Sequence, residues 1–209
     1  MSMYSIKKNI STQLIVEKSK FICSLYKVQS ETQASDIINQ CKKTYWNASH
    51  NCSAYIIGEG MELQKSNDDG EPTGTAGIPM LEVLKKRKLY NVVAVVTRYF
   101  GGIKLGSNGL IHAYSKSIAQ TVDVAGLCQR QAFFDCSFLE RAYNAGKVIN
   151  LLYNQPIFSV ESIIYKEDVT ITIRIKEQDM EKAIQLLEGL FSRKITFVGC
   201  EKIFLEIDI

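Results

Sequence analysis

The sequence contains 209 residues, of which 46% are hydrophobic and 22% are charged. This is an ordinary globular composition and argues against an intrinsically disordered chain. The longest apolar run, residues 92–96, is far too short to cross a bilayer, so we expect no membrane association. We therefore expect a cytoplasmic protein with one large or two small hydrophobic cores.

Charge is distributed unevenly along the chain. Residues 1–131 contain 16 Lys and Arg against 10 Asp and Glu, a net charge of +6, whereas residues 132–209 contain 9 against 12, a net charge of −3. A basic N-terminal part favours an anionic partner. Each part also has a complete set of predicted elements, so we expect two domains, 1–131 and 132–209.

The six cysteines are scattered singly and form no C-x-x-C pair. This spacing suggests neither a disulfide framework nor a zinc site. We expect reduced, mostly buried thiols and predict no metal ion and no cofactor. The cysteines are Cys23, Cys41, Cys52, Cys128, Cys136 and Cys200.

The N-terminal part begins with strands and a helix. Residues 21–28 and 53–57 have the composition of strands. Ser30-Glu31-Thr32-Gln33 is a capping box, which predicts that a helix begins there. The apolar face of this helix consists of Ala34, Ile37, Ile38, Cys41 and Tyr45.

Two further helices frame a buried strand at residues 92–97. The first is short and has Pro79 near its first turn, where a missing N–H is tolerated. The second is long, with apolar residues at helical spacing from Leu110 to Ala125, and Gly126 stops it.

The C-terminal part has the order strand, helix, two strands, helix, strand. This βαββαβ order is the ferredoxin-like plan, so the predicted class is α+β. The strand at residues 169–176 alternates apolar and polar side chains, which predicts that helices cover one face only. The open face of this strand has no aromatic residue, which argues against an RNA-stacking platform in this domain.

Two loops, at residues 68–77 and 98–109, contain seven of the thirteen glycines together with charged and hydroxyl side chains. Each leads into a predicted helix, whose first N–H groups and positive dipole end attract anions. Arg98 and Lys104 supply charge for a phosphate, and Ser107 or Asn108 can cap the helix. The candidate ligand-binding residues are Asp68, Asp69, Glu71, Thr73, Gly74, Thr75, Gly77, Arg98, Gly101, Gly102, Lys104, Gly106, Ser107, Asn108 and Gly109.

Other interpretations of these loops remain open. Neither loop has the spacing of a P-loop or of a dinucleotide fingerprint. In a purely structural interpretation, the glycines form turns and Arg98 pairs with Asp68, Asp69 or Glu71 to hold the loops together. The same three carboxylates suit a Mg²⁺ ion or acid-base chemistry. Tyr99 and Phe100 are expected in the core.

His50 and Cys52 are possible accessory residues. They lie two positions apart at the start of a strand, which places both side chains on one strand face. A Cys-His nucleophile pair is conceivable, but no Cys-His-Asp or Cys-His-Asn signature surrounds them. No catalytic residue is assigned.

The loops resemble the signature of the IMPACT family, whose bacterial members are of the YigZ type. The resemblance lies in Asp-Asp-Gly-Glu-Pro-Thr-Gly-Thr-Ala-Gly at 68–77 and Arg-Tyr-Phe-Gly-Gly-Ile-Lys-Leu-Gly at 98–106. Residues 17–22 and 50–55 also match. It implies an N-terminal domain like the second domain of ribosomal protein S-five and a ferredoxin-like C-terminal domain like the last domain of elongation factor G.

For function, the resemblance implies a link to translation. The resemblance implies that eukaryotic relatives regulate translation through an additional N-terminal domain, and we expect no counterpart of it in this sequence. Our leading hypothesis is a translation-associated regulatory protein that binds RNA, the ribosome or another phosphate-bearing ligand through the paired loops. The alternatives are a small hydrolase, either a metal-assisted phosphohydrolase or a peptidase or amidohydrolase, and a protein-protein interaction module.

Overall fold

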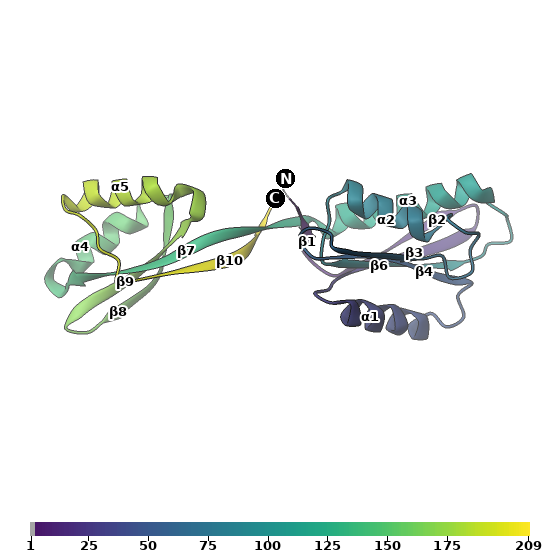
Figure 1. The fold of residues 1–209 in the computed structure, drawn as a ribbon, viewed down its shortest axis with the longest axis horizontal. Helices are drawn as coiled ribbons and strands as arrows, with labels where there is room; N and C mark the ends of the chain where they lie inside the picture. The colour runs from purple at the N-terminus through teal and green to yellow at the C-terminus, as the bar shows by residue number, and fades with distance from the viewer. Residues whose placement is uncertain (1–2) are drawn as a thin grey trace. The chain divides into compact units, whose positions relative to one another are not determined.

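The computed structural model describes residues 3–209, which form a mixed α/β protein (Figure 1). The chain divides into two compact units, which we describe separately. Unit 1 comprises Met1–Gln129 and Asp208–Ile209, and unit 2 comprises Arg130–Ile207. Within the described residues, no helix is both long enough and apolar enough to span a membrane.

Unit 1 is built on a five-stranded antiparallel sheet with the strand order β2-β3-β6-β4-β5. A short strand, β1 (Ser5–Ile6), lies outside this sheet and pairs with the start of β7 (Leu127–Arg141). The strands of the sheet are β2 (Ile10–Val16), β3 (Ser19–Lys27), β4 (His50–Ile57), β5 (Leu63–Asn67) and β6 (Val92–Tyr99).

Helices cover both faces of this sheet. The helix α1 (Glu31–Thr44) lies on one face, and α2 (Gly77–Lys86) and α3 (Gly106–Ala125) lie on the other (Figure 1). The central strand β6 is therefore buried on both sides. Its alternate residues enter two different cores, which is why residues 92–96 are apolar without interruption.

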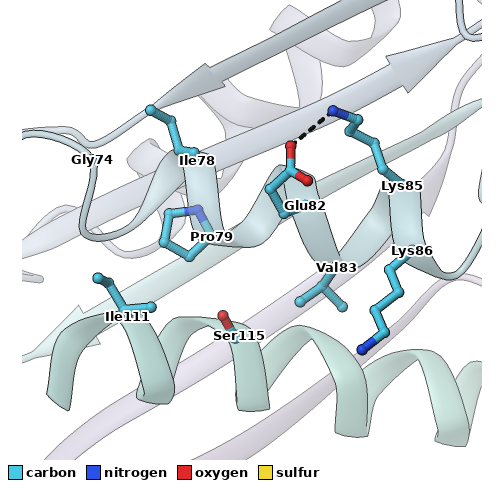
Figure 2. Close-up of a pocket in the computed structure, with 9 residues that line it drawn as sticks. All are labelled: Gly74, Ile78, Pro79, Glu82, Val83, Lys85, Lys86, Ile111 and Ser115. Carbon is cyan, nitrogen blue, oxygen red and sulfur yellow. Dashed lines mark hydrogen bonds and ion pairs between the residues drawn. The ribbon is translucent and has the colours of Figure 1, made fainter. Parts of the chain in front are cut away.

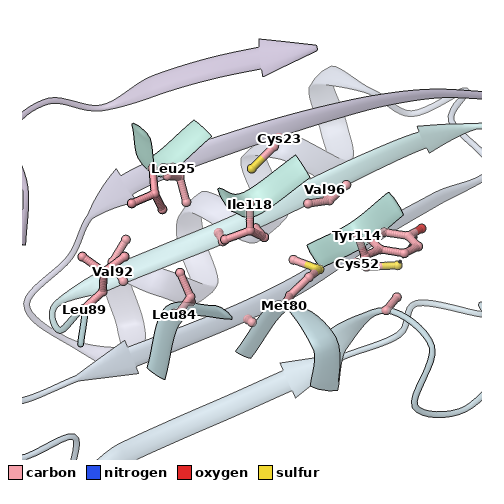
Figure 3. Close-up of a cluster of buried hydrophobic side chains, with 14 of the residues drawn as sticks. Cys23, Leu25, Cys52, Met80, Leu84, Leu89, Val92, Val96, Tyr114 and Ile118 are labelled. Atoms are coloured by element: carbon pink, nitrogen blue, oxygen red, sulfur yellow. Dashed lines mark hydrogen bonds between the residues drawn. The ribbon is translucent and has the colours of Figure 1, made fainter. Parts of the chain in front are cut away.

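The larger core lies between the sheet and the helices α2 and α3 (Figure 3). Cys23, Cys52 and Val96 point into it from three neighbouring strands. Met80 from α2 and Tyr114 from α3 meet them, and both are fully buried. This core fixes the two helices whose N-termini follow the glycine-rich loops.

Local sequence signals mark two helix ends correctly. Ser30 is the N-cap of α1, and its side chain accepts a hydrogen bond from the Gln33 backbone N–H. Gln33 in turn accepts from the backbone N–H of Gln29 at 2.7 Å. Gly126 ends α3 with φ of +71°, a conformation that glycine adopts without strain.

Unit 2 has the predicted order of strands and helices, and its strand order is β10-β7-β9-β8. Val169, Ile171, Ile173 and Ile175 on β9 have no exposed surface and pack against both helices, which confirms the predicted alternation. The elements are β7 (Leu127–Arg141), α4 (Ala142–Tyr153), β8 (Phe158–Tyr165), β9 (Asp168–Lys176), a short 3₁₀ turn (Glu177–Asp179), α5 (Met180–Phe191) and β10 (Gly199–Asp208).

One expectation about the cysteines is wrong. Cys136 and Cys200 form a disulfide, although 64 positions separate them in the sequence. The pairing of β7 with β10 brings them together, and a search for closely spaced cysteine pairs cannot detect such a contact. The thiols of Cys23, Cys41, Cys52 and Cys128 are buried, as expected.

Candidate functional site

The first glycine-rich loop folds around the carboxylate of Asp68. This carboxylate accepts hydrogen bonds from the backbone N–H groups of Gly74, Ala76 and Gly77 at 2.8, 3.1 and 2.7 Å. Burial alone would raise the pKa of Asp68, but these three donors hold it below its ordinary value. The N-terminus of α2 is thus occupied by an anion of the chain itself, so the prediction of free N–H groups there is wrong.

Asp69 ties the same loop to β4 and α1. One of its carboxylate oxygens pairs with Lys42 Nζ at 2.5 Å, and the other accepts the backbone N–H of Asn51 at 2.7 Å. Its carbonyl oxygen lies 2.9 Å from His50 Nδ1. Burial opposes ionisation, but these partners still lower the pKa of Asp69. Both aspartates therefore hold the loop in place.

Glu71 and Arg98 form a buried ion pair. Arg98 Nη1 lies 2.7 Å from Glu71 Oε1, and only 5% of Arg98 and 7% of Glu71 is exposed. The Tyr114 hydroxyl donates to the same oxygen at 2.8 Å, and His50 Nε2 lies 3.9 Å from the other oxygen. The structural interpretation of Arg98 is therefore correct, and its guanidinium is not presented to a ligand.

Cys52 is a buried thiol between the same groups. It donates a hydrogen bond to the carbonyl of Asp68 at 2.9 Å and lies 3.3 Å from the Tyr114 hydroxyl. Burial raises its pKa to about 12, and the three nearby carboxylates add to this effect. A cysteine nucleophile needs a lowered pKa, so this environment does not activate the thiol.

The other predicted residues of the first loop shape the turn. Gly74 has φ of +77°, and a Cβ on Gly77 would lie 2.7 Å from the backbone N of Asn67. The Thr75 hydroxyl donates to the carbonyl of Pro72 at 2.7 Å, whereas Thr73 is exposed. No group of three or more His, Cys, Asp or Glu within residues 3–209 is arranged to hold a metal ion.

The second loop is anchored at one end and open at the other. Gly101 packs directly on the turn between β2 and β3, because a Cβ there would lie 2.1 Å from the carbonyl carbon of Lys18. Gly102 and Gly106 have φ of +86° and +69°, and nothing lies within 4 Å of a Cβ built on either. Lys104 between them is exposed.

Among the described residues, no side chain caps the N-terminus of α3. The helix begins at Gly106, its N-cap is Leu105, and no side chain of that cap accepts a hydrogen bond. Ser107 and Asn108 lie inside the first turn and are exposed, so the prediction that one of them is the cap is wrong. Gly109 completes this turn. The first N–H groups of α3 thus form the more open of the two helix N-termini.

Two aromatic side chains, one in the turn after α1 and one directly after β6, are exposed. Trp46 is 81% exposed and Phe100 is 50% exposed, so the expectation that Phe100 is in the core is wrong. The Tyr99 hydroxyl donates to Asn47 at 3.1 Å, which holds the turn that carries Trp46 against the end of β6. The Phe100 N–H likewise donates to Ser49 at 3.1 Å.

A lysine joins these aromatics from the neighbouring strand. Lys20 lies opposite Tyr99 in the β3–β6 register, and its Nζ is 4.4 Å from the centre of the Tyr99 ring. We call Lys20, Trp46, Tyr99, Phe100 and Lys104 the aromatic-basic surface. Sequence reasoning missed Trp46, although its position just outside the apolar stripe of α1 was an available signal.

Comparisons with known proteins identify the family. The family model of the Impact N-terminal domain matches residues 17–122, which include both loops. A Bacillus subtilis protein, IMPACT family member YvyE, is 42% identical over 205 residues, which are 98% of this chain and 94% of that protein. The chain belongs to the IMPACT family. The resemblance seen in the sequence motifs is thereby confirmed.

Two further matches differ in what they cover. The IMPACT family member YigZ of Escherichia coli is 37% identical over 109 residues, or 51% of this chain and 53% of that protein. A crystal structure described as a hypothetical protein is 23% identical and has a TM-score of 0.60. The aligned part is 96% of this chain and 98% of that protein. The two proteins therefore share a fold over the residues of both units.

Proposed function

We propose that this IMPACT family member is a translation-associated regulatory protein of the cytoplasm that binds RNA, including RNA of the ribosome, through the aromatic-basic surface of unit 1. The observations that carry the proposal are the exposure of Trp46, Phe100 and Lys104 and the contact of Lys20 with the Tyr99 ring. The link to translation rests on the family, whose eukaryotic members regulate that process. The two loops thus differ in role, since the first supports the surface and the second belongs to it.

The chemistry of this surface suits single-stranded RNA. Exposed aromatic rings stack on bases irrespective of sequence, and lysines neutralise phosphates. The uncapped N-terminus of α3 offers N–H groups and a positive dipole end to a phosphate. Residues 17–20, which include Lys20, contain one carboxylate, Glu17, and two lysines. The net charge of this segment is therefore positive.

The fold assignments implied by the family remain part of this proposal. We propose that residues 1–131 form a domain like the second domain of ribosomal protein S-five and that residues 132–209 form a ferredoxin-like domain. The β10-β7-β9-β8 order, with both helices on one face, supports the second assignment. Fold alone does not specify function, so the proposal depends on the surface.

The proposal is tested by RNA binding at two salt concentrations. We expect a single-stranded RNA oligonucleotide and purified ribosomes to bind more weakly at high salt, because phosphate contacts release counterions. Trp46→Ala and Phe100→Ala should each weaken RNA binding roughly tenfold through lost stacking. Lys104→Ala should lower the slope of log affinity against log salt by about one.

Tyr143→Ala is the matched control, because Tyr143 in unit 2 is 91% exposed but lies outside the aromatic-basic surface. We expect it to bind RNA as the unaltered chain does. Salt-independent binding, or an equal loss in the control, would contradict the proposal.

The hydrolase alternatives receive less support from the geometry. Asp68, Asp69 and Glu71 are engaged by backbone N–H groups, Lys42 and Arg98, and the pKa of Cys52 is raised. A ligand that binds only the folded protein raises its melting temperature. We expect millimolar Mg²⁺ or Mn²⁺ to leave the melting temperature unchanged. A clear increase in the melting temperature would instead support the phosphohydrolase hypothesis.

A further inference from the structure

A groove runs between α2 and α3 in unit 1 (Figure 2). Two adjoining hollows of about 800 and 630 Å³ form it, and both are lined by Val83, Lys86 and Ser115. It shares no residue with the aromatic-basic surface. The groove is therefore a second candidate site, independent of the proposed RNA contact.

The floor of the groove is aliphatic. Pro79 and Val83 from α2 face Ile111 from α3 across it (Figure 2). Ile78 is 53% exposed and Ile111 is 38% exposed, although the opposite face of α2 is buried in the core. These helices therefore leave apolar surface on their outer side that the packing of unit 1 does not use.

The rim of the groove is basic. Its charged lining consists of four cationic side chains and one carboxylate, Glu82, which already pairs with Lys85 at 2.8 Å. Lys86 extends from α2 toward α3 (Figure 2). The cationic residues are Lys85, Lys86, Lys116 and Arg87, the last of which pairs with Asp123 at 2.9 Å.

We propose that this groove binds an acidic amphipathic helix of a protein partner. An amphipathic helix places apolar residues at positions i, i+3, i+4 and i+7 into a groove of this kind. Carboxylates on its flanks would face the lysines of both walls, which gives charge complementarity. RNA fits less well, since no Phe, Tyr or Trp is among the described residues that line the groove and a phosphate backbone has no apolar face.

The proposal is tested with a designed peptide and the intact chain of 209 residues. The probe is a fluorescent helical peptide with leucines on one face and glutamates on its flanks. Its binding is followed by fluorescence anisotropy, and its location by NMR shifts of the Ile78 and Ile111 methyl groups. We expect both methyl groups to shift on binding, whereas a scrambled peptide of the same composition should leave them unchanged.

Two variants separate the contribution of the basic rim to peptide binding from that of the apolar floor. Lys86→Glu combined with Lys116→Glu should weaken peptide binding roughly tenfold, because two attractions become repulsions. Ile111→Ser should also weaken it, and Ile111 is 38% exposed and is not part of the buried core cluster of unit 1. Lys43→Glu on α1 is the control for a change of net charge alone, and melting curves verify that all variants are folded.

Several outcomes would overturn the proposal. Equal binding of the ordered and scrambled peptides, or an equal effect of Lys43→Glu, would show general charge attraction. Methyl shifts caused by an RNA oligonucleotide but not by the peptide would assign the groove to RNA. Concentration-dependent dimerisation that the double variant abolishes would assign it to a second copy of the chain. None of these results depends on whether the aromatic-basic surface binds RNA.

Discussion

The two glycine-rich loops of unit 1 have similar compositions but opposite structural roles. In the first, Asp68, Asp69 and Glu71 are all engaged with groups of the same chain. In the second, Lys104 is exposed and the helix that follows has no side-chain cap. A loop rich in glycine and charge is therefore not by itself a binding site, because its own carboxylates can occupy the N–H groups.

The largest expected effect concerns the buried ion pair of the first loop. Glu71→Ala leaves Arg98 buried without its partner, and we expect a loss of about 3–5 kcal/mol in the free energy of unfolding. Urea denaturation measures it. Glu82→Ala is the control, because it breaks an exposed ion pair and should cost less than about 1 kcal/mol. Similar costs for both would show that the first loop is not held by its buried pair.

The second prediction concerns the anchored end of the second loop. In Gly101→Ala the new methyl group would meet backbone atoms of Lys18 and Ser19, which cannot move independently of the β2–β3 turn. We expect a destabilisation of about 1–3 kcal/mol in thermal unfolding. Gly146→Ala, in an open position of α4, should instead stabilise the protein by up to about 1 kcal/mol. If Gly101→Ala left the thermal stability unchanged, the second loop would not be anchored at Gly101 either.

The third prediction uses the pKa of Asp68, which lies below its ordinary value of 3.8 in the folded protein. The stability from this carboxylate is complete above the ordinary value and is lost as pH falls through the lowered one. Asp68→Asn should cost about 1 kcal/mol at neutral pH and lose stability less steeply below about pH 4. Unfolding curves at several pH values measure this. Parallel pH profiles for both proteins would contradict the capping role.

The smallest effect is expected at the open end of the second loop. Lys104 has an exposed side chain, so Lys104→Ala should change the free energy of unfolding by less than about 0.5 kcal/mol. A melting curve is sufficient. A loss as large as that of Asp68→Asn would mean that the second loop is a structural device like the first.

Sequence reasoning was most successful where the signal is local. The capping box at Ser30, the stop at Gly126 and the alternation of β9 each depend on residues within one or two turns or along one strand. The family was also recognisable, because the motifs of both loops are specific. The strand β2 was missed, since the polar Thr12 interrupts its alternating apolar residues.

The errors arose where contacts join distant positions. Asp68 caps a helix that begins nine residues later, beyond the usual distance between a cap and its helix. The disulfide between Cys136 and Cys200 depends on strand pairing across unit 2. The exposure of Trp46 depends on the turn that Tyr99 fixes through Asn47. Each of these is decided by tertiary structure.

The double-sided burial of β6 has a practical consequence. Backbone amides in such a strand exchange with deuterated water only when the surrounding unit opens as a whole. In unit 2, β9 lies between β7 and β8 and its inward residues are fully buried, so we expect its amides to be protected in the same way although only one of its faces is covered. Deuterium uptake at these two strands therefore gives two separate opening free energies from one intact chain. Equal values would indicate that the units unfold together, and different values would indicate that one can open while the other stays folded.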